Sequence, residues 1–583
     1  MNPRVSRIPD KLYDLSILSV IENYHTYKHE LRKLPETLVF DVYYKLFVEK
    51  RICFLGLELN NLDIFARMLK VTFRRHDFMK MFLAVMDHGG HGKRVSQDLA
   101  QAYLKRCKTV MNEPLKLKEL VDLGLNLGGF LNDCGWYVEA QDVLQKCLEL
   151  CHLDHTHAAE THSLCRFLEC CSRLLHAQAA FCNFSGANET YQTALCAMSQ
   201  LEGEAQAALL TSLYTEFSAM HFNKGEYDES YRWSRRAVES LAPTLPVRVV
   251  VDVLRQQAKA CVVKREFERA GLIARQAMLL SRDVFCRGHP KYSDTLIDYG
   301  FYLLNFDMIR QAVVVYEKAL DIRRKTYGKV NLRVAMAHED LAYALYVYEY
   351  NSGRFLRARE NAEVAIDIMS QLLPPDHLML ASVKRVKALI LEEIALDSFQ
   401  STSAMQILLN DAEQLHLSAL KLAMSTFGER NVQTAKHFGN LGRLYQSMKR
   451  LEEAEAMHLK AIAIKEELLG PEDYEVGLSI GHLASLYNYH MKNYKKAEQL
   501  YLRSINISLK LFGEGYSGLE YDYRGLVNVY ENTEDAAKLA EYSHLLNSWK
   551  FQHDLQVDQE SKSDFYGEKR LALKDIIECL HTS

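Results

Sequence analysis

The sequence predicts an all-α fold: helix pairs stacked into a right-handed superhelical solenoid, with a separate helical segment ahead of them. Three observations lead to this fold class. A small–large–small pattern of residues recurs along most of the 583-residue chain, and loops containing Gly with Pro, Asp or Asn recur between its copies. The low count of 10 prolines also favours long helices over many short strands.

Composition narrows the function classes. With 71 Lys and Arg against 75 Asp and Glu, the formal charge of -4 opposes a broad basic face for nucleic acid. No apolar run is long enough to span a bilayer, and the N-terminus lacks the apolar core of a signal peptide. The 13 scattered cysteines are then expected to be reduced thiols, which predicts a cytoplasmic and nuclear protein.

Residues 8–51, the first element, lie outside the repeat. One helical face carries apolar and small residues: Leu12, Leu15, Ser16, Val20 and Ile21. A second motif follows, made of Leu34, Pro35, Leu38 and Asp41, in which proline is suited to the first turn of a new helix. An alternative is a helix pair that caps the solenoid, as terminal repeats require. Residues 52–115 are expected to form a helical N-terminal cap.

The solenoid is expected to span residues 116–548 in about nine to ten units. In one copy Gly300 is followed by Ala312, Tyr316 and Ala319, and in another Gly442 is followed by Ala454, His458 and Ala461. Small residues allow two antiparallel helices to cross closely, and this is the tetratricopeptide pattern. The last small residue of each unit is Cys147, Ala194, Ala237, Ala277, Ala319, Ala365, Ala419, Ala461 or Ser504.

The connections and the tail complete the chain. Loops such as CRGHPKY and FGERN offer Gly for the helix C-cap and Pro, Asp or Asn for the next helix start, with His289 and His377 in capping or packing roles. The polar stretch Asp397 to Gln406 reads as an inserted loop. Residues 549–583 are predicted to be a charged tail, either disordered or ending in a capping helix from Leu571 to Leu580.

At its anchors and loops the sequence resembles kinesin light chain. Blocks such as NVQTAKHFGNLGRLYQSM and GYSGLEYDYRGLVNVY are similar to a kinesin-light-chain-like family of substrate receptors of cullin-RING ubiquitin ligases, over about residues 8 to 548. The resemblance implies that Leu12, Ser16 and Val20 dock on elongin C of the elongin B/C pair. It likewise implies that Leu34, Pro35, Leu38 and Asp41 contact a cullin-two type scaffold.

The inner wall of such a solenoid is made by the first helix of each pair. Counting from the small residues gives these inner-wall candidates: Asp294, Asp298, Glu339, Asp340, Tyr343, Lys436, Asn440, Arg443, His482, Asn488, Tyr521, Tyr523 and Arg524. Acidic residues precede basic ones, which suits a peptide with a basic side chain and a free C-terminal carboxylate. The resemblance adds C-terminal degrons with a basic residue and a glycine. The alternative is an ordinary solvated surface.

Rival functions have weaker support. A kinesin-light-chain-like adaptor would link membrane-protein tails, such as that of amyloid precursor protein, to microtubules, but no sustained heptad repeat is present. No catalytic or phosphate-binding motif predicts an enzyme, and no cofactor is expected. A zinc site among Cys147, Cys151, His152, His155, His157, His162 and Cys165 lacks close Cys-x-x-Cys pairs, so packed thiols are the preferred interpretation.

Overall fold

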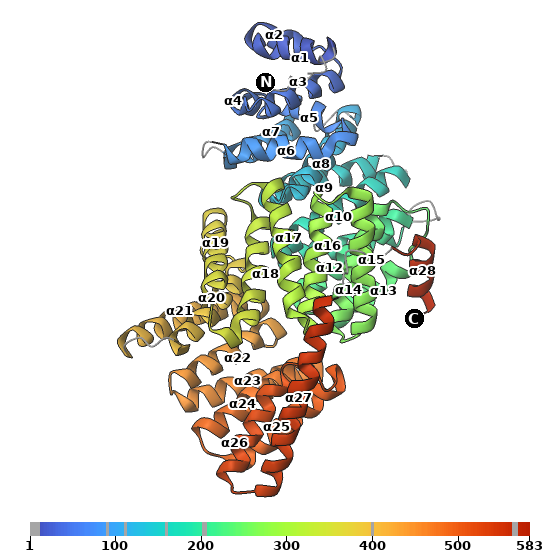
Figure 1. Cartoon of the computed structure of the whole chain (residues 1–583). Helices are drawn as coiled ribbons and strands as arrows, with labels where there is room; N and C mark the ends of the chain where they lie inside the picture. The colour runs from blue at the N-terminus through green and yellow to red at the C-terminus, as the bar shows by residue number, and fades with distance from the viewer. Residues whose placement is uncertain are drawn as a thin grey trace, which may run out of the picture. The chain divides into compact units, whose positions relative to one another are not determined.

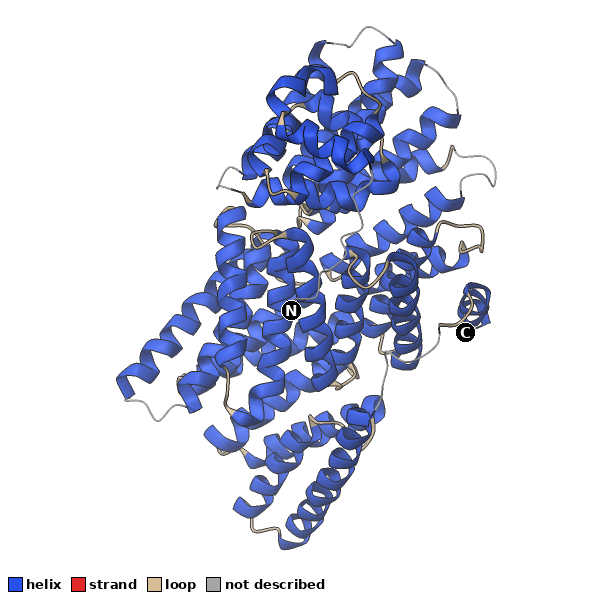
Figure 2. Ribbon diagram, turned by 45° about the horizontal axis from the view of Figure 1, so that its top comes forward, coloured by secondary structure: helices blue, strands red, loops and turns tan. Residues whose placement is uncertain are grey.

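The computed structural model describes residues 12–88, 92–109, 114–157, 161–200, 207–397, 402–562 and 570–582. Every regular element in those ranges is helical, which confirms the predicted fold class (Figures 1 and 2). The chain divides into two compact units. Unit 1 comprises Met1–Glu216 with Arg323–Arg333, and unit 2 comprises Phe217–Ile322 with Val334–Ser583.

Unit 1 begins with short helices and continues with longer ones. They are α1 (Leu12–Glu22), α2 (Tyr24–Leu31), α3 (Glu36–Val48), α4 (Ile52–Leu59), α5 (Leu62–Leu69), the 3-10 turn η1 (Thr72–Arg74), α6 (Arg75–Asp87), α7 (Gly92–Thr109), α8 (Pro114–Asp133), α9 (Tyr137–His157), α10 (Thr161–Ala180) and α11 (Phe184–Met198). Helix α12 (Ala207–Lys224) leads into unit 2. Residues 8–11 of the predicted N-terminal segment lie outside the described residues.

Unit 2 is built of helix pairs, and the segment Arg323–Arg333 between two of its helices belongs to unit 1. The pairs are formed by α13 (Tyr227–Glu239), α14 (Val247–Val263), α15 (Phe267–Phe285), α16 (Pro290–Asn305), α17 (Ile309–Tyr327), α18 (Leu332–Glu349), α19 (Leu356–Leu372), α20 (Met379–Asp397), α21 (Thr402–Phe427), α22 (Val432–Ser447), α23 (Leu451–Leu469), α24 (Tyr474–Ser485), α25 (Tyr494–Phe512), α26 (Leu519–Asn532) and α27 (Ala536–Lys562). The one-turn segments η3 (Tyr350–Ser352) and η4 (Leu486–His490) extend α18 and α24, and α28 (Leu573–Thr582) follows α27.

The small residues lie where paired helices cross. A Cβ atom added to Gly300 of α16 would lie 2.7 Å from the Tyr316 ring of α17, and one added to Gly442 of α22 would lie 2.9 Å from the His458 ring of α23. The nine predicted anchors at the ends of the pattern are all at most 3% exposed. The sequence pattern therefore marked the helix crossings correctly.

The loops between pairs use the predicted capping chemistry. Gly428 and Gly470 have φ values of 74° and 90°, where a side chain would be strained. The Asn431 side chain then caps α22 by accepting from the Gln433 amide at 2.8 Å. His289 and His377 act in the same way, since each ring Nδ1 accepts from the backbone amide two residues later.

Two segments differ from the sequence-based expectation. The stretch from Asp397 to Gln406 is not a loop throughout, because α21 begins at Thr402 and residues 398–401 lie outside the described ones. The long spacing there comes largely from α21, which has 26 residues. The tail also contains more helix than expected, since α27 continues to Lys562 and α28 covers Leu573–Thr582.

Candidate functional site

Helix α1 carries a leucine side chain that is exposed to solvent. Leu12 leaves 81% of its surface exposed, while Ile21 on the same helix is fully buried and anchors it. The Ser16 hydroxyl is exposed and donates to the Leu12 carbonyl at 2.8 Å. Val20 is half-buried. The exposed end of α1 thus offers an apolar side chain beside a small residue whose hydroxyl already has a partner.

The second N-terminal motif surrounds the start of α3. Leu34 and Pro35 are exposed and Leu38 is half-buried. The sequence predicted that Pro35 lies in the first turn of a helix. In the structure Pro35 is the N-cap residue of α3, one position earlier. The Asp41 carboxylate is held within unit 1, where it pairs with Arg74 and accepts from the Tyr13 hydroxyl at 2.7 Å.

In unit 2 the first helices of successive pairs share a polar inner face. We use "inner face" for the side chains through which α14, α16, α18, α20, α22 and α24 interact with one another: Asp252, Arg255, Lys291, Asp294, Asp298, Glu339, Tyr343, Tyr346, Arg385, Glu392, Lys436, Arg443 and Glu475. Side chains of non-successive helices meet on this face, because Arg443 of α22 donates to the Tyr346 hydroxyl of α18 at 2.9 Å.

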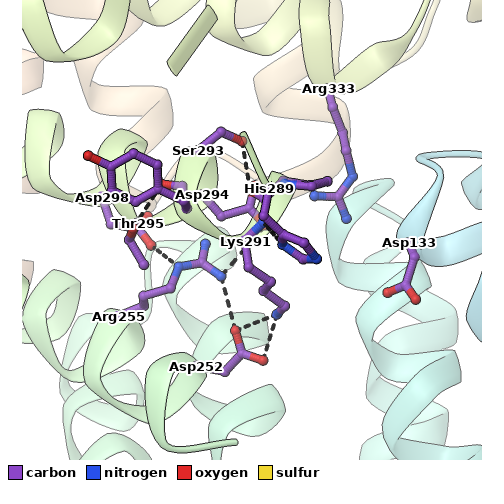
Figure 3. A network of polar contacts seen from close by, with 12 residues as sticks. Asp133, Asp252, Arg255, His289, Lys291, Ser293, Asp294, Thr295, Asp298 and Arg333 are labelled. Carbon is purple, nitrogen blue, oxygen red and sulfur yellow. Dashed lines mark hydrogen bonds and ion pairs between the residues drawn. The ribbon is translucent and has the colours of Figure 1, made fainter. Parts of the chain in front are cut away.

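The acidic part of the inner face carries its own countercharges (Figure 3). Arg255 donates to Asp298 at 2.6 Å and lies 3.9 Å from Asp294. It also donates to Asp252, which accepts from Lys291 at 2.6 Å. Burial acts to raise the pKa of Asp252, but Lys291 and Arg255 outweigh it and lower that pKa. Asp294 and Asp298 are therefore tied to Arg255 in the structure.

Glu339 and Arg385 differ from these neutralised groups. Within the described residues the Glu339 carboxylate has no cation within 4.0 Å, and burial raises its pKa while Ser382 and Arg385 lower it. The Arg385 guanidinium lies 5.1 Å from the Tyr343 ring centre. Among the residues that the structure describes, it pairs with no carboxylate. A carboxylate and a guanidinium without ion-pair partners among the described residues thus lie on α18 and α20, the first helices of successive pairs. Asp340, the next residue, is half-buried.

The basic part of the inner face is paired. Lys436 lies 3.2 Å from Glu475, which also accepts from Lys465 at 2.9 Å. Arg443 donates to the buried Glu392 from Nη2 at 2.9 Å and from Nε at 3.2 Å. Two of the predicted carboxylate-binding cations are therefore engaged with carboxylates of unit 2.

Sequence reasoning did not find a set of contacts between distant segments of unit 2. Arg265, at the turn between α14 and α15, donates twice to Asp473 at the start of α24. Asn431 donates to the Lys224 carbonyl at 2.8 Å, and Asp307 accepts from the Ser517 amide at 2.6 Å. The partners are 207 to 210 positions apart, so no local pattern could indicate them.

Comparison with known proteins identifies the chain's relatives. The tetratricopeptide repeat family matches residues 408–467 and 476–515. Amyloid protein-binding protein 2 of Mus musculus is 52% identical over 550 residues, covering 94% of this chain and 93% of the relative, and the Rattus norvegicus protein matches equally. The chain belongs to the amyloid protein-binding protein 2 family. The repeats and these relatives indicate a repeat-containing adaptor with protein partners.

Solved structures of low sequence identity are also similar to this member of the amyloid protein-binding protein 2 family. A Rap protein complexed with competence and sporulation factor covers 67% of this chain and 99% of its own, at 14% identity and a TM-score of 0.49. BtubC from P. vanneervenii covers 45% and 92%, at 21% identity and a TM-score of 0.29. Across the described residues, no helix combines the length and apolar character that a membrane crossing needs.

The remaining predicted residues of this family member take different positions. Asn440 and His482 are half-buried, and Tyr521 is 43% exposed and faces the His482 ring. Asn488 is fully buried and donates to the Gly525 carbonyl at 3.0 Å, so it joins two repeats. Tyr523 is buried against Tyr542. Arg524 points outward and pairs with Glu520.

The cysteine-rich stretch of this family member forms a different cluster from the one considered in the sequence. Cys147 and Cys151 of α9 meet Cys170 of α10, and Cys165 is not part of the group. The His152 ring lies edge-on to Phe167. The His155 and His157 side chains lie outside the described residues.

Proposed function

We propose that this chain is the substrate-recognition subunit of an elongin B/C–cullin-RING E3 ubiquitin ligase, acting in the cytoplasm and nucleus. It would capture C-terminal degron peptides that carry a basic residue and a glycine on the inner face of unit 2. The subunit performs no chemistry itself. It holds a substrate near a ubiquitin-loaded enzyme, so that transfer proceeds at high effective concentration.

Leu12 is the observation that carries the ligase half of the proposal. An apolar side chain that is 81% exposed gains about 25 cal/mol for each Å² that a partner covers. The neighbouring Ser16 adds little cost to docking, because its hydroxyl already donates to the Leu12 carbonyl. The proposal therefore places Leu12 in a pocket of elongin C. It places Leu34, Pro35, Leu38 and Asp41 against the cullin.

Glu339 and Arg385 support the peptide half. The inner face neutralises Asp294 and Asp298 with Arg255 but leaves Glu339 without a cation in the described residues. We therefore assign the basic degron residue to Glu339 and its neighbour Asp340, and the C-terminal carboxylate to Arg385 beside Tyr343. A glycine is selected where the helix wall approaches the peptide backbone too closely for a Cβ atom.

Affinity purification tests the ligase half. The double variant Leu12→Ala with Pro35→Ala is expected to lose co-purifying elongin C and the cullin. Leu57→Ala is the matched control, because Leu57 is 69% exposed on α4 of the same unit but lies outside both motifs. Equal recovery of elongin C with the double variant and with wild type would remove this half of the proposal.

A screen of random C-terminal peptides tests the other half. Wild type is expected to select Arg or Lys together with Gly, and to lose affinity when the peptide C-terminus is amidated. Glu339→Gln should remove the preference for a basic residue, while Glu360→Gln on the exposed surface of α19 should keep it. A screen without basic selection, or one that Glu339→Gln leaves unchanged, rejects the assignment of Glu339.

The name of the relatives favours a second candidate function. Those proteins are called amyloid protein-binding, which suits an adaptor that links the cytoplasmic tails of membrane proteins, such as amyloid precursor protein, to microtubule-based transport. The same purification separates the two candidates. Recovery of kinesin heavy chain, in place of elongin C and a cullin, would favour the adaptor.

A further inference from the structure

Three thiols converge in unit 1, outside every contact used above. Cys147 and Cys151 lie one helical turn apart on α9, and Cys170 meets them from α10. Their sulfur atoms all lie within 4.8 Å of one another, and each side chain is at most 1% exposed. This spacing is compatible with three sulfur ligands around one ion, since a metal–thiolate bond is about 2.3 Å long.

Each of the three thiols also contacts a backbone carbonyl. Cys147 donates to the Val121 carbonyl at 3.4 Å, and Cys170 donates to the Leu144 carbonyl at 3.4 Å. Cys151 makes a longer contact of 4.0 Å with the Arg166 carbonyl. These carbonyl contacts use the S–H groups and leave the sulfur lone pairs unused, and the burial of all three side chains keeps bulk water away from them.

Helix α8 approaches α9 closely beside the sulfurs, at a glycine. A Cβ atom on Gly124 of α8 would lie 2.8 Å from the Cys147 sulfur and 2.2 Å from the Tyr103 hydroxyl. Glycine thus lets α8 approach α9 without placing a side chain against the sulfur. No histidine or carboxylate of the described ranges joins the three sulfurs at this spacing.

We propose that Cys147, Cys151 and Cys170 bind one Cu(I) ion. Thiolates select soft cations such as Cu(I) and Zn(II). Structural zinc almost always takes four protein ligands, whereas a closed-shell monovalent ion accepts three sulfurs in a plane. Binding involves no change in oxidation state, and each thiol that becomes a thiolate releases one proton.

Cys171 provides a matched control. It follows Cys170 directly on α10 and is equally buried, but it does not belong to the three-sulfur group. If the cluster serves packing alone, Cys170→Ser and Cys171→Ser should behave alike toward metal. If it binds Cu(I), only Cys170→Ser and Cys151→Ser should weaken binding.

The experiment uses the full reduced chain under anaerobic conditions, with exposed thiols such as Cys53, Cys196 and Cys286 alkylated beforehand. Cu(I) is titrated against a chromophoric chelator, and bound copper is examined by ultraviolet charge-transfer absorption and X-ray absorption. Wild type and Cys171→Ser are expected to retain one equivalent bound by three sulfurs. Cys151→Ser and Cys170→Ser are expected to bind at least about tenfold more weakly.

Several outcomes would overturn the proposal. Failure of wild type to retain one equivalent does so, as does equal affinity of Cys170→Ser and Cys171→Ser. Preferential retention of Zn(II) added alone, with a four-coordinate spectrum, rejects Cu(I). Circular dichroism verifies the folding of each variant. If Cys170→Ser does not fold, the copper affinity of Cys151→Ser and the absorption spectrum of the wild type decide whether the cluster binds Cu(I).

Discussion

Arg265 and Asp473 are joined by two hydrogen bonds across 208 sequence positions. The guanidinium donates from Nε and Nη2, each at 3.2 Å, and both side chains are nearly buried. Asp473 at the same time caps α24 by accepting from the Glu475 amide at 2.8 Å. One aspartate therefore starts a helix and ties it to the turn between α14 and α15, so that distant repeats of unit 2 support each other.

Replacing Arg265 by Ala should loosen this tie without unfolding the repeats. Hydrogen bonds to charged groups contribute about 1.5–3 kcal/mol each in proteins, so a loss of that order is expected. Hydrogen exchange should accelerate around residues 265–270 and 473–478, while the rest of unit 2 stays protected. Lys264→Ala is the control, because Lys264 forms an exposed pair with Asp228. Unchanged exchange at both segments would contradict a supporting role.

The two glycines of α22 should respond oppositely to alanine. A Cβ atom at Gly442 would lie 2.9 Å from the His458 ring, which is fully buried and has little room to move. Overpacking of this kind costs about 1–3 kcal/mol. A Cβ atom at Gly439 meets only the Ala461 methyl group at 3.8 Å, so Gly439→Ala should gain up to about 1 kcal/mol of helix stability. Denaturant unfolding of both variants measures the difference, and similar changes in the two would contradict the crossing-point interpretation.

Sequence reasoning succeeded where local spacing decides the structure. Gly442 and His458 could be paired because a helix crossing imposes a fixed interval along the chain. Sequence reasoning could place Arg443 on the first helix of its pair. It could not identify Glu392 as the ion-pair partner of Arg443. The position of Glu392 relative to Arg443 depends on how adjacent repeats rotate, which the repeat pattern does not encode. The same limit applies to Arg255, whose pairing neutralises Asp294 and Asp298 of the predicted acidic cluster.

Arg443 is expected to act in folding rather than in binding a peptide carboxylate. Removing one partner of a buried ion pair costs about 3–5 kcal/mol, because the other charge stays buried alone. Arg443→Met should therefore destabilise strongly, since Glu392 is 1% exposed. The double variant with Glu392→Met should recover most of that loss in a double-mutant cycle measured by chemical unfolding. Additive losses in the double variant would indicate that the two side chains are not coupled.

Asp522 should give the protein an unusual dependence on pH. The carboxyl is 3% exposed on α26, and its hydrogen-bond donor is the Ser504 hydroxyl at 2.6 Å. Burial raises its pKa to about 7, although Ser504 acts to lower it. In the unfolded chain an Asp has a pKa of about 3.9. Between these values the folded state binds more protons, so this group's contribution to stability falls as the pH rises from about 4 to 7.

Asp522→Asn isolates that contribution. The amide resembles the protonated acid and can still accept from Ser504, so the variant should gain on the order of 2 to 3 kcal/mol relative to wild type between pH 5 and pH 8. Buried His437 and His458, with pKa values lowered by burial to about 3 and about 4, act in the opposite direction in both proteins and cancel in the comparison. Glu531→Gln on the exposed surface of α26 is the control and should show no such gain. Chemical unfolding at pH 5 and pH 8 measures the free energy of unfolding of each protein. If the difference between Asp522→Asn and wild type is the same at both pH values, the Asp522 carboxyl is already ionised in the folded protein at pH 5.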